Sequence, residues 1–162
     1  MLSDLTLADL GNIALMVQAI VVIVSIGFIW YQLRETTRLT RAANTQKLVE
    51  LSSPFNLQLI ENRELAQFWV QGGKNWSTMD EVDKYRYRSL VVWWLILHEN
   101  IYYQWQKKLI DEETYTSWAN DLKVFVVEQN LEQNWDEWKT PFQPSFQEHV
   151  HQLIEGHRKQ RK

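Results

Sequence analysis

An uncharged run of nineteen residues, from Ile13 to Tyr31, constrains this chain more than any other feature. As a helix with a rise of about 1.5 Å per residue it would span roughly 28 Å, close to the hydrocarbon thickness of a bilayer. The core helix of a soluble domain carries charge on one face, and this run carries none. The sequence therefore predicts a helix that crosses a membrane once.

The flanks of the run argue against a cleaved signal peptide. Such a peptide begins with basic residues, has an apolar stretch of about 7–15 residues and ends in a small-residue cleavage site. Here the leader contains Asp4 and Asp9 and no Lys or Arg, and the run ends in the bulky sequence Phe-Ile-Trp-Tyr at 28–31. We therefore expect the run to be retained as an anchor.

The basic residues predict the orientation of this anchor. All seventeen Lys and Arg residues lie at or after Arg34, and Arg34, Arg38 and Arg41 crowd the first turns after the run. The positive-inside rule then places the C-terminal domain in the cytoplasm and the short acidic N-terminus outside. The absence of cysteine fits a reducing compartment.

The remainder of the chain predicts one all-α domain. It is long enough for a single compact domain, helical signals dominate it, and no segment is typical of a strand. We expect one N-terminal transmembrane helix that continues into a cytoplasmic helical bundle. The expected divisions are residues 1–33 for the N-terminus and span, 34–53 for a helical neck, and 54–162 for the cytoplasmic domain.

Breaker residues predict where the first helices end. The long helix is expected to end at Ser52-Ser53-Pro54, because the residue before a proline is pushed away from helical geometry. A short helix pair should follow over residues 55–70 and close at Gly72-Gly73. The next helix should start near Ser77, with Asp80 three residues on, and extend to about Leu109.

The middle of that next helix, residues 90–97, is apolar on every face, which is typical of a central helix buried on all sides. Eight apolar residues are too few for a second span. We expect this helix to be wrapped by segments around Phe68/Trp69 and Trp118/Phe125.

Three further helices are predicted towards the C-terminus. Asp111 should cap a helix that reaches about Glu128, and residues 131–139 should form a short helix that carries tryptophan. Ser145 should cap a last helix that reaches about Gly156.

No catalytic motif is found in the sequence, which lacks cysteine, a glycine-rich phosphate loop, a serine nucleophile elbow and a paired metal motif. His149 and His151 are two residues apart on a predicted helix, so their rings point to different faces. A near-neutral soluble part argues against nucleic acid as a partner. We predict no catalytic residue, no cofactor and no metal site, and a protein that is not an enzyme.

Two sets of polar residues remain as candidate functional residues. His98, Glu99 and Asn100 adjoin the apolar stretch and could form a buried polar network with Tyr102, Tyr103 or Arg86; a raised pKa at Glu99 would instead indicate proton handling.

In the span, small and polar residues recur every seven positions along one stripe of the helix: Gly11, Gln18, Ser25 and Gln32. Such a stripe is typical of helix association in lipid, where small residues allow close approach and polar ones bond across the contact. The alternative is a tolerated glutamine and a serine that bonds its own backbone.

Several short motifs follow the uncharged span: Tyr-Gln-Leu-Arg-Glu-Thr-Thr-Arg at 31–38, Ala-Ala at 42–43, Glu-Asn-x-Tyr-Tyr-Gln at 99–104, Leu-Ile-Asp at 109–111 and Pro-Ser-Phe at 144–146. In the span and these motifs the chain resembles a widespread group of uncharacterised bacterial membrane proteins. The resemblance implies a single-pass protein of the bacterial inner membrane and no particular activity.

Three classes of function remain open. The favoured one is a non-enzymatic, membrane-anchored accessory or scaffold subunit, whose partners are membrane lipid and either other membrane-protein subunits or copies of itself. The second is a homo-oligomeric pore or gate lined by the polar stripe, although Val22 and Ile29 beside it make the stripe mostly dry. The third is a membrane-tethered enzyme or ligand sensor that uses the His98/Glu99 region.

Overall fold

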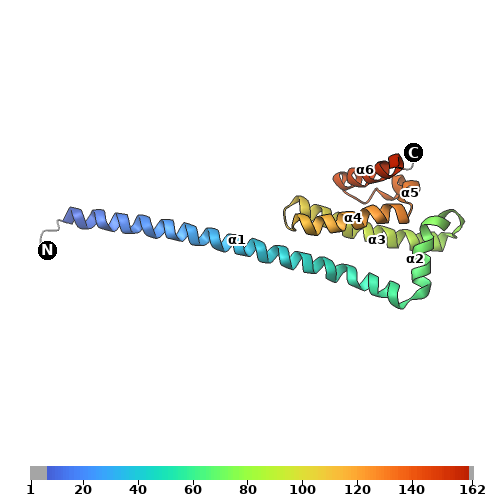
Figure 1. Cartoon of the computed structure of the whole chain (residues 1–162), viewed down its shortest axis with the longest axis horizontal. Helices are drawn as coiled ribbons and strands as arrows, with labels where there is room; N and C mark the ends of the chain where they lie inside the picture. The colour runs from blue at the N-terminus through green and yellow to red at the C-terminus, as the bar shows by residue number, and fades with distance from the viewer. Residues whose placement is uncertain (1–6, 161–162) are drawn as a thin grey trace. The chain divides into compact units, whose positions relative to one another are not determined.

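The computed structural model describes residues 7–160, apart from the side chains of residues 8 and 9. Over that range the protein is helical and contains no strand, which confirms the predicted all-α class (Figure 1). The helices are α1 (Leu7–Glu61), α2 (Arg63–Asn75), the short 3-10 helix η1 (Trp76–Thr78), α3 (Glu81–Gln106), α4 (Glu112–Glu128), α5 (Leu131–Trp138) and α6 (Pro144–Gln160).

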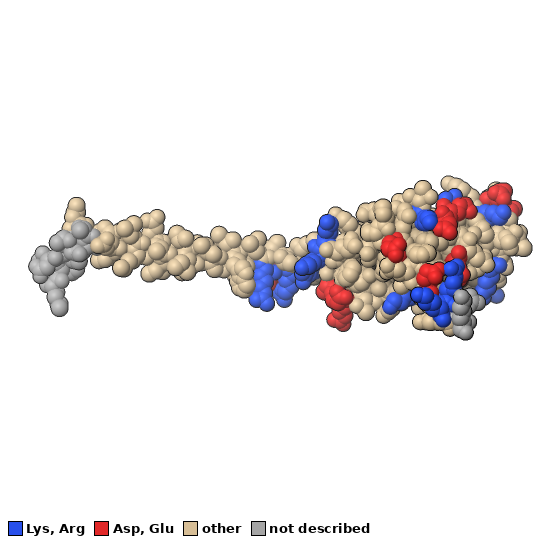
Figure 2. Space-filling model, turned by 90° about the horizontal axis from the view of Figure 1, so that it is seen from above, with Lys and Arg blue, Asp and Glu red and all other residues tan. Residues whose placement is uncertain are grey.

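The chain divides into two compact units between Thr40 and Arg41. What the structure describes of the first unit is the N-terminal part of α1, which is long and apolar enough to cross a membrane. None of that apolar window is buried inside the protein, unlike the core helix of a soluble domain. On the face drawn in Figure 2, the apolar run from Ile13 to Tyr31 shows no charged side chain, and basic side chains appear after it.

The predicted end of the first helix at Pro54 is wrong, because α1 continues through this proline to Glu61. Proline cannot donate a hydrogen bond to the carbonyl four residues earlier, which weakens the helix locally. Two serine hydroxyls bond the turn before it: Ser53 Oγ donates to the Val49 carbonyl at 2.6 Å and Ser52 Oγ donates to the same oxygen at 3.1 Å. Both bonds lie within α1, in the turn just before Pro54.

Packing just after Pro54 explains why the helix continues. The ring of Phe55 lies against three indoles of the second unit, with centroid distances of 5.0 Å to Trp69, 5.1 Å to Trp93 and 5.3 Å to Trp94. Aromatic contacts of this kind contribute about 0.5–1.5 kcal/mol each beyond the area that they bury. Tertiary packing therefore overrides the local preference of the residue before proline.

The prediction that a helix pair ends at Gly72-Gly73 is also wrong. The break comes earlier, at Asn62, whose side chain accepts a hydrogen bond from the Leu65 amide at 3.0 Å and so caps α2. Both glycines lie inside α2 and are buried. A Cβ atom on Gly72 would collide with the Tyr87 ring, and one on Gly73 would lie 2.7 Å from the backbone of Gln129. These glycines permit close helix packing.

The remaining helix starts follow the predicted caps with small shifts. Asp80, not Ser77, caps α3 and accepts a hydrogen bond from the Asp83 amide at 2.8 Å. Asp111 caps α4 as predicted and accepts from the Thr114 amide at 2.7 Å. The short helix predicted over residues 131–139 is confirmed as α5. The last helix begins at Pro144, a favourable first position, and extends beyond Gly156 to Gln160.

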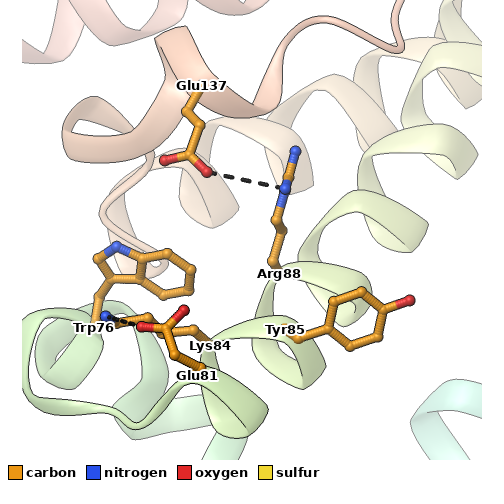
Figure 3. Close-up of a pocket in the computed structure, with 6 residues that line it drawn as sticks. All are labelled: Trp76, Glu81, Lys84, Tyr85, Arg88 and Glu137. Atoms are coloured by element: carbon orange, nitrogen blue, oxygen red, sulfur yellow. Dashed lines mark hydrogen bonds and ion pairs between the residues drawn. The ribbon is translucent and has the colours of Figure 1, made fainter.

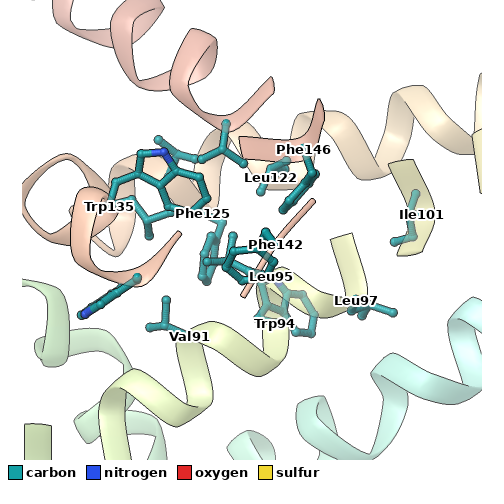
Figure 4. Packing of buried hydrophobic residues seen from close by; sticks show 14 of the residues in the cluster. Val91, Trp94, Leu95, Leu97, Ile101, Leu122, Phe125, Trp135, Phe142 and Phe146 are labelled. Atoms are coloured by element: carbon teal, nitrogen blue, oxygen red, sulfur yellow. The ribbon is translucent and has the colours of Figure 1, made fainter. Parts of the chain in front are cut away.

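One face of α3 forms the centre of the core (Figure 4). Val91, Trp94 and Leu95 of this face are buried. The side chains gathered against them come from α4, α5, α6 and the loop before α6, namely Leu122, Phe125, Trp135, Phe142 and Phe146. As predicted, Phe125 belongs to this core and Phe68, Trp69 and Trp118 pack against it.

The expectation that α3 is buried on every side is wrong for the opposite face. Trp93 is 40 % exposed and Ile96 is 49 % exposed. Both belong to the apolar stretch for which the sequence predicts full burial. The core lies on the other side of α3, so both side chains are partly exposed, although Trp93 also contacts Phe55 of α1.

We expect Gly73→Ala to lower the free energy of unfolding by about 1–3 kcal/mol, because a methyl group pressed against backbone atoms cannot be relieved by a rotamer change. Gly156→Ala is the matched control, since that glycine lies in α6 and a Cβ atom placed on it would have no neighbour within 4 Å. Alanine at position 156 should raise the free energy of unfolding by about 0.5–1 kcal/mol. Chemical unfolding of the full-length protein in detergent, followed by tryptophan fluorescence, measures both. Equal effects would contradict the close approach at Gly73.

Candidate functional site

His98 is buried in an aromatic environment between α3 and α4. Its side chain is 2 % exposed, and its Nε2 atom lies 3.1 Å from Oδ2 of Asp121, a half-exposed residue of α4. The rings of Trp94 and Trp118 meet the imidazole edge to face at 5.7 and 5.9 Å. A polar ring so deeply buried needs a hydrogen-bond partner, and Asp121 provides it.

Asp121 is not among the residues that the sequence predicts for this site. The two partners are 23 positions apart, so no local motif joins them. The available signal is the helical spacing of α4: Trp118, Leu122 and Phe125 point to the core, and Asp121 is adjacent to that apolar stripe. An acid at the edge of a core-facing stripe is a candidate partner for a buried histidine.

Glu99 and Asn100 do not join His98 in one network. The Oε1 atom of Glu99 accepts a hydrogen bond from the Gln143 amide, just before α6, at 2.6 Å. Its carboxylate therefore lies near the start of a helix, where the helix dipole favours negative charge. Asn100 is exposed and accepts from Gln104 Nε2 at 2.8 Å within its own helix. The three consecutive residues thus connect to three different parts of the chain.

His149 and His151 lie on different sides of α6. His149 is half-buried and stacks on Tyr102, with 4.7 Å between ring centroids, whereas His151 is exposed. Burial lowers the pKa of His149, and the charges of Lys123 and His98 lower it further. Within residues 7–160, no group of three or more His, Cys, Asp or Glu residues is arranged to hold a metal ion.

The polar stripe of the span is exposed along its length. Nothing lies within 4 Å of a Cβ atom placed on Gly11, and the side chains of Gln18, Ser25 and Gln32 are exposed. The Ser25 hydroxyl donates to the Val21 carbonyl at 2.7 Å, so its own helix satisfies it. The two glutamine amides are the groups in this stripe that gain most from a partner in lipid.

A second exposed stripe lies on α3, and we call it the open face. At about 100° per residue its apolar members fall within an arc of about 80°. They are Val82, Tyr85, Trp93, Ile96 and Tyr103. The exposed fractions range from 40 % at Trp93 to 73 % at Tyr85. Sequence analysis missed this stripe because the apolar stretch at 90–97 hides the period of 3.6 residues.

One cavity of about 410 Å³ adjoins the N-terminal end of α3 (Figure 3). Lys84 pairs with Glu81 at 3.0 Å, and Arg88 lies 3.9 Å from Glu137 of α5. Trp76 lies beside the Lys84–Glu81 pair, while the Tyr85 ring points away from it. The basic groups of this cavity are already matched by acids, so it offers no unpaired charge to a ligand.

Comparison of the chain with protein-family models, curated proteins and solved structures finds no match in any of the three. The pair of buried His98 and half-exposed Asp121 connects two core helices, whereas the open face of α3 and the polar stripe of α1 are exposed.

The lowered pKa of His149 predicts a pH-dependent stability. Where the folded pKa is below the ordinary value of about 6.5, the unfolded chain binds more protons, so the free energy of unfolding falls as the pH drops below about 6.5. The loss levels off below the folded pKa. His149→Phe should flatten this slope while retaining an aromatic stack on Tyr102.

Unfolding of the full-length protein in detergent between pH 5 and 8 measures this dependence. His151→Gln, on the exposed side of the same helix, is the control and should leave the slope unchanged. A slope that His149→Phe does not alter would refute the assignment to His149.

Proposed function

We propose that this protein is a single-span membrane protein that works by association, as a non-enzymatic accessory or scaffold subunit of a membrane assembly or homo-oligomer. The proposal places the domain in the cytoplasm, following the basic residues after the apolar run. The observation that carries it is the open face of α3.

Apolar side chains in one stripe are costly to leave in water. Scattered apolar residues are normal on a protein surface, whereas a contiguous patch is typical of an interaction site. Trp93, Ile96 and Tyr103 all lie on the open face, and aromatic residues are enriched in the centres of interfaces. This composition supports a protein partner for α3.

The polar stripe of the span supports the same conclusion in lipid. Hydrogen bonds between membrane helices contribute only about 0.6–2 kcal/mol each, so Gln18 and Gln32 can select a partner but cannot hold it alone. Apolar burial on the open face can supply the larger part of the association energy. The two stripes therefore have complementary roles, selection in the membrane and affinity outside it.

The environment of His98 supports a structural rather than a catalytic role. Its side chain is 2 % exposed, so a substrate cannot reach the imidazole without opening the core. Glu99 is bonded to the Gln143 amide and does not contact the His98–Asp121 pair by a hydrogen bond. These contacts join α3 to α4 and to the loop before α6.

We expect the full-length protein, extracted in a mild detergent, to have a mass above that of one chain. Ile96→Glu should weaken the assembly about tenfold or more, because it introduces a charge into the open face. Gln18→Leu combined with Ser25→Leu should weaken it less. Light scattering measures the mass, and circular dichroism checks the fold.

Val124→Glu is the matched control for Ile96→Glu. Val124 is also an exposed apolar residue of the domain, 54 % exposed, but it lies on α4. This variant should keep the assembled mass. A wild-type protein that is a single chain, or an Ile96→Glu variant that stays fully assembled, would contradict the proposal.

A further inference from the structure

A cavity of about 680 Å³ at the turn between α3 and α4 is lined by charged groups of both signs. Arg41 and Lys108 provide cations, and Asp111 and Glu112 provide carboxylates. The indole of Trp105 lies beside them. All five residues belong to the second unit of the chain.

The opposite charges of this cavity do not pair with each other. Neither Arg41 nor Lys108 has a nitrogen within 4.0 Å of a carboxylate oxygen of Asp111 or Glu112. The cavity therefore has positive and negative groups on one surface that are not paired with each other.

Other hydrogen bonds hold these groups in place. Arg41 Nε donates to the Lys108 carbonyl at 3.2 Å, which attaches the turn to α1 and leaves the remaining guanidinium donors available. Trp105 Nε1 donates to Glu112 Oε2 at 2.7 Å.

Asp111 is held as a carboxylate by Thr114. The Thr114 amide and hydroxyl donate to Asp111 at 2.7 and 3.1 Å. These bonds hold the pKa of Asp111 below its usual range, so it stays negatively charged.

We propose that this cavity binds the phosphoethanolamine headgroup of a membrane lipid. The phosphate is bound by Arg41 and Lys108, since guanidinium and ammonium groups form charge-assisted hydrogen bonds to phosphate oxygens. The ammonium group is bound by Asp111 and Glu112. Their carboxylate oxygens can accept further hydrogen bonds from a primary ammonium, whereas a quaternary ammonium has no N–H to donate. A purely anionic headgroup would leave the two carboxylates without a counter-charge.

The position of Arg41 in the sequence favours a lipid as the source of this headgroup. This step rests on the proposed membrane span. Arg41 follows Arg34, the first charged residue after the apolar run, by seven residues, or about 10 Å along a helix. A leaflet's headgroup layer is about 5–8 Å thick. A long basic side chain such as that of Arg41 extends far enough to reach back to this headgroup layer.

Native mass spectrometry of the full-length protein in detergent tests the proposal. The probes are dioleoyl phosphatidylethanolamine, phosphatidylcholine and phosphatidylglycerol. We expect the ethanolamine lipid to bind about tenfold more tightly than the other two. Arg41→Gln and Glu112→Gln should each abolish this preference, while both keep a group that can replace the local hydrogen bond. Lys139→Gln, which breaks a surface ion pair with Asp136, is the control and should retain it.

Three results would overturn the proposal. One is equal binding of the three lipids, another is a preference for the glycerol lipid that survives Glu112→Gln, and the third is binding of water-soluble phosphoethanolamine as tightly as of the lipid. Unfolding midpoints of the variants show whether they are folded. Ile96→Glu should keep the lipid preference, so failure of the association proposal and failure of the lipid proposal are distinguishable.

Discussion

A buried phenol connects three helices of the domain. Tyr87 of α3 is fully buried, and its hydroxyl donates to Oε1 of Gln129, at the end of α4, at 2.6 Å. Burial raises the pKa of Tyr87, so the phenol stays protonated and remains a donor. Its ring fills the space that Gly72 leaves in α2, and Gly73 lies against the backbone of Gln129. The two glycines, the tyrosine and the glutamine thus fix α2, α3 and α4 together.

This arrangement has a consequence for the opposite side of α3. The helix is long and apolar around residues 90–97, but the core lies on one side of it, so Ile96 and part of Trp93 remain exposed. The fold therefore combines a side of α3 that holds the domain together with a side that is available to a partner. The association that we propose uses the available side, and it does not require the core to open.

Local chemistry makes part of this structure predictable. The apolar run, the cap at Asp111 and the short helix at 131–139 depend on residues adjacent in the sequence, and they follow from the sequence alone. Pro54 and the pair Gly72-Gly73 are misleading because their local preference is to end helices. At Pro54 the contacts of Phe55 with distant indoles decide the outcome, and at the glycines close helix packing does.

The candidate sites depend even more on distant residues. His98 is identifiable from its position beside the apolar stretch, but its partner Asp121 comes from another helix. The cavity at the α3–α4 turn joins Arg41 to Lys108 across 67 positions. No spacing rule connects residues so far apart, so only the folded chain shows that their charges share one surface.

The association and lipid proposals share one topology, a single span with the helical domain in the cytoplasm. Because the chain has no cysteine, single cysteines can be introduced by Ser3→Cys or Lys162→Cys and labelled in intact cells with a membrane-impermeant maleimide. We predict labelling of the Ser3→Cys variant from outside, and labelling of the Lys162→Cys variant only after the membrane is permeabilised. Labelling of Lys162→Cys in intact cells would contradict the account.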